Sequence, residues 1–199
     1  MKSFFTSAIA GALAALCLLA AGPLIAHESQ ASVDHRHYDG ASAPNHSAWI
    51  RSPLVAKVRM VTKRYKDINV ALAEGWVPAT PCVSGPSEGA MGVHYVLPER
   101  VGDGMLLADQ PEALIYEPLP DGRLRLVGVE FIVIAEQWNT RNPDAQPALE
   151  GHLLNLVGEP NRYRLPAFYE LHVWAWERNS DGAFADWNRA VSCEAQPLQ

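Results

Sequence analysis

The sequence predicts an α+β domain in which one N-terminal amphipathic helix packs on a mostly antiparallel sheet, with long loops between the elements. Two observations support this fold class. Apolar residues first recur at helical spacing, between residues 52 and 75, and later gather in short runs rich in Val, Ile, Tyr, Phe and Trp. Without residues 1–26 the chain has a length that suits one domain with its own core, and it contains no internal repeat, so we expect residues 49–199 to form a single domain.

The segment 1–26 has the pattern of a secretory signal peptide. Lys2 supplies a positive start, residues 8–21 form an apolar run, and small residues follow it. The apolar run is shorter than the roughly 20 residues that a membrane-spanning helix needs. We therefore expect cleavage after Ala26, or alternatively after Ala31. The product would be an exported protein without a membrane span, located in the periplasm or outside the cell.

Residues 27–48 are mostly polar or small and predict a flexible leader in front of the domain. Removal of the signal peptide takes away one positive charge, Lys2, and makes the net charge one unit more negative than the −6 of the whole chain. Binding to nucleic acid needs a clustered positive face that neutralises phosphates. We therefore expect no nucleic-acid partner.

Ser52 and Pro53 predict the start of the amphipathic helix, since Ser is a preferred N-cap and Pro is favoured in the first turn. The apolar positions recur at the spacing of one helical face: Val55, Val58, Val61, Tyr65, Ile68 and Leu72. Gly75 is the predicted end of the helix. Basic residues occupy most of the opposite side and indicate a solvated face, with contact to anionic lipid or ligand as the alternative.

The segments predicted to be strands are 91–97, 112–117, 123–135 and 168–178. Segment 123–135 is apolar on both faces apart from Arg125 and Glu130, which predicts a central strand. Between residues 136 and 167, prolines and glycines predict long loops, with one short helix near residues 149–157.

The cysteines predict a disulfide bond. Cys17 lies within the predicted signal peptide, which leaves Cys82 and Cys193 in the exported chain. In an oxidising compartment, an isolated pair of cysteines most simply forms a disulfide. Closing a loop of this length would stabilise the fold by about 4–5 kcal/mol on the chain-entropy view. Two free buried thiols are the alternative.

Three histidines and one glutamate lie within or beside the most apolar stretches of the chain: His94, Glu130, His152 and His172. Burial of an ionised carboxylate or an unpaired imidazole costs free energy, so each group needs a partner in the fold. Imidazole and carboxylate together suit zinc, copper, iron, nickel or manganese. We therefore predict that these four residues bind a divalent transition metal, whose identity the sequence leaves open.

The predicted strands place particular neighbours beside these groups. On a strand, Glu130 shares its face with Gly128, where the missing side chain leaves room for another group. His172 shares its face with Trp174 and Trp176, an arrangement more typical of a pocket wall than of a plain core. We therefore expect the two tryptophans to line a pocket that holds the metal ion or a small ligand.

Two other functions are consistent with the same residues. The His/Glu group can be a hydrogen-bonded network that orders the core of a non-catalytic binding or structural protein, for example by pairing Glu130 with His172 or Arg125. Alternatively, the protein is a periplasmic hydrolase in which His94 or His172 acts as general base. The sequence does not decide whether the protein is an enzyme.

Two further motifs point to chemistry less directly. Residues 85–89 match Gly-x-Ser-x-Gly, the nucleophile elbow of hydrolases, with Ser87 as nucleophile, but a strand-like segment follows where the motif needs a helix. After cleavage at Ala26 the chain would begin with His27, whose amine and imidazole are able to chelate copper. A glycine-rich loop and a solvated tail are the simpler interpretations.

Five segments together resemble a group of exported bacterial proteins of unassigned function: 91–96, 111–118, 126–131, 165–174 and 184–188. The resemblance covers most of residues 60–193 and implies no mechanism. The segment 125–131, Arg-Leu-Val-Gly-Val-Glu-Phe, is also similar to the middle motif of the oil-body-associated protein family. His94 and His172 match the histidine-containing segments of that family loosely, and its paired histidines are absent from this sequence.

Overall fold

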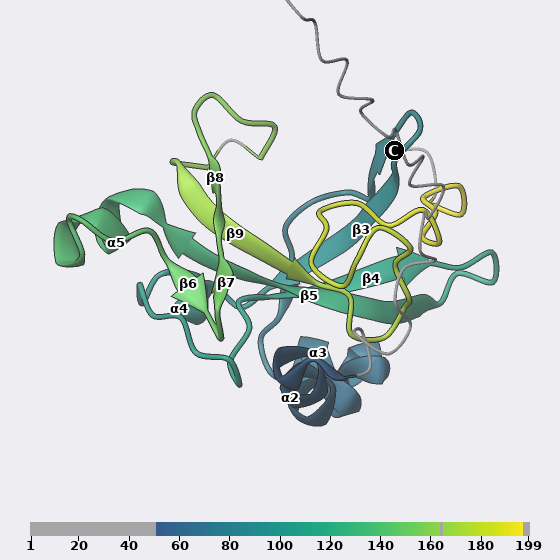
Figure 1. The fold of residues 1–199 in the computed structure, drawn as a ribbon. Coiled ribbons are helices and arrows are strands. Elements are labelled where there is room, and N and C mark those ends of the chain that lie inside the picture. Colours follow the sequence, from purple (N-terminus) through teal and green to yellow (C-terminus); the bar gives the residue numbers. More distant parts are fainter. Residues whose placement is uncertain (1–50, 164, 197–199) are drawn as a thin grey trace, which may run out of the picture. The chain divides into compact units, whose positions relative to one another are not determined.

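The computed structural model of the protein describes residues 51–163 and 165–196 (Figure 1). These residues form an α+β fold with a seven-stranded sheet, a separate two-stranded sheet and a few short helices, in agreement with the predicted fold class. The predicted signal peptide and leader lie outside the described residues. Within the described ranges, none of the helices has the length and apolar character that crossing a bilayer requires.

The first described segment forms three consecutive short helices where the sequence predicted one continuous helix. They are α2 (Pro53–Thr62), η1 (Lys63–Lys66) and α3 (Ile68–Ala73). The side chain of Ser52 caps α2 by accepting a hydrogen bond from the Val55 amide at 3.3 Å. The interruption lies at Asp67, whose backbone is extended and whose carboxylate caps α3 by accepting from the Asn69 amide at 3.0 Å.

The main sheet is antiparallel at every described pairing, with the strand order β1-β3-β4-β5-β9-β8 and with β2 also paired to β3. Its strands are β1 (Val77–Pro78), β2 (Val83–Gly85), β3 (Gly89–Val96), β4 (Ala113–Pro118), β5 (Leu124–Ile134), β8 (Asn155–Val157) and β9 (Phe168–Val173). The segment predicted to be central is β5, which lies between β4 and β9 and is the longest strand among the described residues.

The chain between β5 and β9 differs from the prediction. The helix expected near residues 149–157 is absent; the described chain there forms the hairpin of β6 (Ala148–Leu149) and β7 (His152–Leu153), followed by β8. Glu150 and Gly151 connect the hairpin with positive φ angles of 49° and 85°, a pair that suits a two-residue turn and breaks a helix. The short helix of this part of the chain is α5 (Ala135–Arg141), directly after β5, and a further short helix, α4 (Pro98–Val101), follows β3.

The last strand is shorter than predicted: β9 ends at Val173, and residues 174–178 leave the sheet. The Trp174 amide donates to the Ala183 carbonyl at 2.8 Å, and the Trp176 and Glu177 amides both donate to the Val127 carbonyl at 3.0 Å. Because the chain turns here, the alternation of side chains along β9 does not continue to Trp176.

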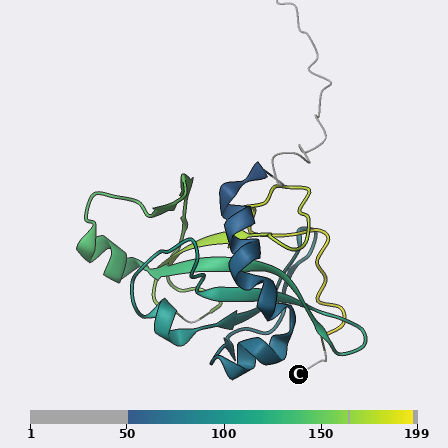
Figure 2. The same ribbon diagram turned by 90° about the horizontal axis from the view of Figure 1, so that it is seen from below.

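The two faces of the sheet are covered differently. Helices α2 and α3 lie on one face (Figures 1 and 2), where Leu54, Val55 and Val58 belong to the main apolar core with Leu114 and Phe131. The opposite face carries two smaller apolar clusters. One contains Ala90, Ile115, Val127, Trp174 and Val191, and the other contains Ala113, Ile132 and Phe168. The candidate site lies between these two clusters.

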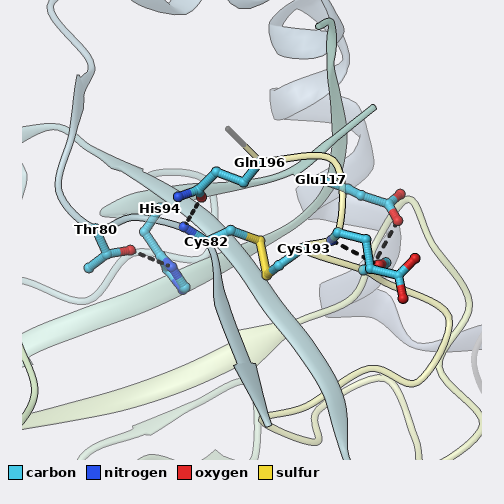
Figure 3. The surroundings of a disulfide bond; sticks show 8 residues. Thr80, Cys82, His94, Glu117, Cys193 and Gln196 are labelled. Carbon is cyan, nitrogen blue, oxygen red and sulfur yellow. Dashed lines mark hydrogen bonds between the residues drawn. A yellow bond between two sulfur atoms is a disulfide. The ribbon is translucent and has the colours of Figure 1, made fainter. Parts of the chain in front are cut away.

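A disulfide bond joins Cys82 and Cys193, the pair that the sequence predicted (Figure 3). Their Cα atoms are 5.6 Å apart, within the usual range for a disulfide, although the residues are 111 positions apart in the chain. Two hydrogen bonds hold the same region: Gln196 Oε1 accepts from the Cys82 amide, and Glu117 accepts from the Ser192 amide at 3.0 Å. The C-terminal segment is thereby tied to the chain that precedes β2.

Candidate metal centre

Three of the four predicted ligands converge on the face of the sheet opposite α2. Glu130 on β5 is directly opposite His172 on β9, and Ala113 on β4 is opposite Glu130 on its other side. His94 on β3 is opposite Ile115, the next residue on the same face of β4. The small side chain of Ala113 leaves the space in which His94 and Glu130 meet across β4.

The contacts within this group are close and buried. The Nε2 atom of His94 lies 3.3 Å from Glu130 Oε2 and 3.5 Å from His172 Nε2. The exposed fractions are 4% for His94, 5% for Glu130 and 0% for His172. One potential ligand atom from each residue lies within 4.8 Å of the other two, so the three side chains are able to hold one metal ion. We call His94, Glu130 and His172 the central triad.

The second ring nitrogen of His94 has a polar neighbour outside the triad. Thr80 Oγ1 lies 3.3 Å from His94 Nδ1, and Figure 3 shows the Thr80 side chain facing that ring. The backbone holds this segment in place, since the Ala79 amide donates to the His94 carbonyl at 2.8 Å. Metal-binding histidines commonly hydrogen-bond through the nitrogen that does not bind the metal, which fixes the ring orientation. Thr80 is suited to that role.

Burial disfavours the charged form of each residue of the central triad. It lowers the pKa of His94 to about 4. Burial, with a smaller contribution from His94, lowers the pKa of His172 to about 3. Burial, followed by the charge of Glu170, raises the pKa of Glu130 well above its usual value of 4.5. Burial therefore acts against an ion pair at the 3.3 Å contact between His94 and Glu130, because it disfavours the charged form of both groups.

Two carboxylates that sequence reasoning did not select extend this cluster. Glu170 on β9 is buried, and its side chain is hydrogen-bonded to that of Glu130. Asp186, in the loop after β9, lies 3.9 Å from His172 Nδ1 through its Oδ1 atom. Glu170 shares the strand face of His172, so the alternation along β9 was a signal for it. No local pattern in the sequence marks Asp186, because a loop brings it to the site.

A small pocket of about 80 Å³ opens beside the triad. Its polar lining consists of Thr80, His94, Glu130 and Tyr163. The rest of the lining is apolar: Ala79, Val96, Ile132, Leu165 and Phe168. The pocket has room for a few water molecules or for a ligand of a few heavy atoms. Two of the three triad residues face this space, whereas His172 is not part of its lining.

Three residues predicted for the site do not have the roles expected of them. His152 is in the β6–β7 hairpin and packs against Phe184, with ring centroids 3.7 Å apart, and it belongs to neither cluster of potential metal ligands among the described residues. Neither Trp174 nor Trp176 lines the pocket beside the triad.

The two tryptophans pack on different parts of the fold. Trp174 stacks on His172, with ring centroids 6.1 Å apart, and it covers Gly128, where an added Cβ would lie 3.4 Å from its ring. The space that Gly128 leaves is therefore filled by Trp174 and not by a ligand. Trp176 follows the end of β9 and donates from Nε1 to Thr62 Oγ1 at 3.0 Å, which places its ring beside α2.

Ser87 does not lie in a nucleophile elbow. It is exposed in the turn between β2 and β3, and its hydroxyl donates to Glu88 Oε1 at 2.7 Å. The segment that follows is strand β3, where the motif needs a helix.

Comparison of the chain with family models, with curated proteins and with solved structures finds no match. The residues and geometry of the site are therefore the basis for any statement about function.

Proposed function

We propose that the protein is an exported metal-binding protein in which His94, Glu130 and His172 hold one divalent transition-metal ion. Two imidazoles and one carboxylate form a nitrogen and oxygen donor set that suits zinc, copper, iron, nickel or manganese. Three protein ligands leave at least one coordination position for water or another ligand. The identity of the ion is a question for the experiment below.

The spacing of the ligand atoms carries this proposal. Two atoms that each lie 2.0–2.2 Å from one tetrahedrally coordinated ion are roughly 3.3–3.6 Å apart. The two separations that involve His94 Nε2 are 3.3 and 3.5 Å, inside that range. Both are longer than the roughly 2.9 Å that a well-formed hydrogen bond prefers. The spacing in these two pairs is therefore closer to that of two ligands on one ion than to that of a tight hydrogen-bonded network.

The pocket supports a role for the open coordination position. Because His94 and Glu130 line the pocket, an ion bound to them borders it as well. The surrounding side chains are mostly apolar, and the space is small, so the pocket favours a ligand of a few heavy atoms over a large substrate. We include such a small ligand in the proposed function and assign no reaction to the site.

Elemental analysis of the exported protein without a histidine tag tests the metal site. We expect bound metal in the wild type, a higher melting temperature with the metal than after chelation, and loss of most of the metal in Glu130→Gln. Glu136→Gln is the matched control, because Glu136 is exposed on α5. His152→Ala should also keep the metal, since His152 lies outside the triad.

A hydrogen-bonded core network predicts a different result. In that case the wild type carries no metal, and zinc, copper, nickel or manganese does not change its melting temperature. The Glu130→Gln variant is then destabilised to the same extent with and without added metal, because the buried groups around Glu130 lose a hydrogen-bond partner in either case. This combination of results would reject the metal site.

Export is supported by the N-terminal sequence and by the disulfide between Cys82 and Cys193. Mass measurement of the protein recovered from outside the cytoplasm tests it. We expect a chain that begins at His27, or at Ser32 if cleavage follows Ala31. An uncleaved chain that is retained in the cytoplasm would contradict the proposal.

A further inference from the structure

His172 has a second ring nitrogen that the central triad does not use. The Nδ1 atom is buried and has no hydrogen-bond partner among the described residues, and the same holds for Glu170 Oε2. Both residues are more than nine-tenths buried. Asp186 completes a second group, in which one potential ligand atom from each of Glu170, His172 and Asp186 lies within 4.8 Å of the others. Buried polar atoms without partners are rare and need an explanation.

The distance between His172 and Asp186 is informative. His172 Nδ1 and Asp186 Oδ1 are 3.9 Å apart, too far for a hydrogen bond. Two ligands of one ion at 2.0–2.2 Å are separated by roughly 3.4 Å at a tetrahedral angle and by about 4.2 Å when they lie on opposite sides. The observed distance falls between these values. The two residues therefore face each other with the separation of ligands that share an ion.

We propose that Glu170, His172 and Asp186 bind a second divalent cation, so that the ring of His172 bridges two metal ions. The second ion satisfies the buried His172 Nδ1 and Glu170 Oε2 atoms together. The second site goes beyond the proposed function, and only the bridging role of His172 rests on the ion in the central triad.

The charges of the cluster agree with two cations. Among the described residues, Glu130, Glu170 and Asp186 have no Lys or Arg within salt-bridge distance, and the charge of Arg162 acts on Glu170 only from farther away. When both ring nitrogens coordinate, the ring of His172 loses its N–H proton to the solvent and becomes an imidazolate. Three carboxylates and one imidazolate then balance two divalent ions. Buried charges need such compensation.

The second site has a path to solvent. Asp186 exposes 36% of its side chain, whereas His172 is fully buried. Asn155 on β8 supports the position of Asp186, because its Nδ2 atom donates to Asp186 Oδ1 at 3.3 Å. A cation is thus able to reach the group through Asp186, and water molecules on the exposed side complete its coordination.

Metal stoichiometry tests the second site. The full exported chain, without a tag and stripped with chelator, is titrated with Zn²⁺ or Co²⁺ and followed by calorimetry and by elemental analysis after dialysis. We expect two equivalents in the wild type and one in Asp186→Asn. In Asp186→Asn the affinity for the second equivalent should fall by more than roughly 10–100-fold, which is the loss expected when a residue only supports a metal ligand through a hydrogen bond. Asp181→Asn, an exposed carboxylate of the same loop, is the matched control and should keep two.

Three further variants separate the sites. His94→Gln should lose only the equivalent of the central triad, Glu170→Gln should lose only the second, and His172→Gln should lose both. Circular dichroism in the presence of chelator checks that each variant is folded. The wild-type stoichiometry tests the proposal even if a core variant does not fold.

The outcomes distinguish this proposal from the proposed function. One equivalent in the wild type that Asp186→Asn retains overturns the second site and leaves the central triad standing. Two equivalents that both survive in Asp186→Asn also overturn it. If the wild type retains one equivalent that His94→Gln keeps and Asp186→Asn loses, the second site stands and the central site is rejected. No bound metal at all rejects both.

Discussion

The Nε2 atoms of His94 and His172 lie 3.5 Å apart, although the two residues belong to β3 and β9, which are separated in the sheet by β4 and β5. One potential ligand atom of each ring also lies within 4.8 Å of a carboxylate oxygen of Glu130. This contact exists because all three residues occupy the same face of one antiparallel sheet and because Ala113 leaves room between them. The alternation of side chains along each strand determines which residues reach this face.

Replacement of Thr80 by Val should weaken metal binding without removing the site. The change takes away the hydroxyl that lies 3.3 Å from His94 Nδ1 and keeps the shape of the side chain. We expect metal affinity to fall by roughly 10–100-fold with unchanged stoichiometry, measured by competition with a chelating dye. Thr140→Val is the control, because the Thr140 hydroxyl bonds only to the Glu136 carbonyl within α5. Equal affinities in both variants would remove Thr80 from the metal site.

Glu112 should make stability depend on pH. It is 2% exposed, its Oε2 atom accepts from the Ile132 amide at 2.9 Å, and burial raises its pKa from 4.5 to about 8. Since the folded-state pKa is the higher one, the contribution of this carboxyl group is fully present below pH 4.5. It is lost as the pH rises toward 8, at up to about 1.4 kcal/mol per pH unit.

Glu112→Gln removes this titration while keeping a side-chain acceptor for the Ile132 amide. Relative to the wild type, the variant should therefore gain a few kcal/mol in unfolding free energy between pH 5 and pH 8. Urea unfolding of metal-free protein at a series of pH values measures the difference. Glu136→Gln, at an exposed position, is the control. A Glu112→Gln difference that does not vary with pH would show that Glu112 titrates normally.

The disulfide should be present in the isolated protein and should stabilise it. Peptide mass spectrometry under non-reducing conditions should find Cys82 joined to Cys193. Replacement of both cysteines by Ala should lower the unfolding free energy by about 2–5 kcal/mol. Two alkylatable thiols in freshly isolated protein would contradict this prediction.

Gly128 should not tolerate a side chain. An added Cβ would lie 2.8 Å from the Val173 carbonyl oxygen and 3.4 Å from the Trp174 ring. We expect Gly128→Ala to destabilise the protein by about 1–3 kcal/mol, because the backbone of β9 has to move. Gly158→Ala is the matched control, since nothing lies within 4 Å of an added Cβ there. Urea unfolding that finds both variants equally stable would contradict the close approach of β9 at this position.

Several features of the fold were predictable from local sequence. The β-branched and aromatic runs became β3, β4, β5 and β9, because such side chains suit a half-buried pleated surface. The burial of His94, Glu130 and His172 followed from their apolar surroundings. These predictions succeeded because they depend on residues adjacent in the chain.

Predictions that depended on where the chain leaves a strand or turns were less successful. Trp176 was expected beside His172 because the strand was extended to residue 178, whereas β9 ends at Val173. His152 was expected in the site because of its residue type, whereas the turn at Glu150 and Gly151 places it in a hairpin against Phe184. In both cases, a turn of a few residues changed the direction of the side chain.

The sequence alone indicated the α+β class, the cysteine pair and the burial of His94, Glu130 and His172, although it grouped His152 with them. These follow from hydrophobic period, residue type and the cost of burying a charge. Only the tertiary structure decided that Ala113 leaves room for His94 and Glu130 to meet across β4, that Glu170 joins the cluster and that a loop brings in Asp186. Register and loop path arise from packing between segments far apart in the chain, so no local pattern specifies which side chains meet.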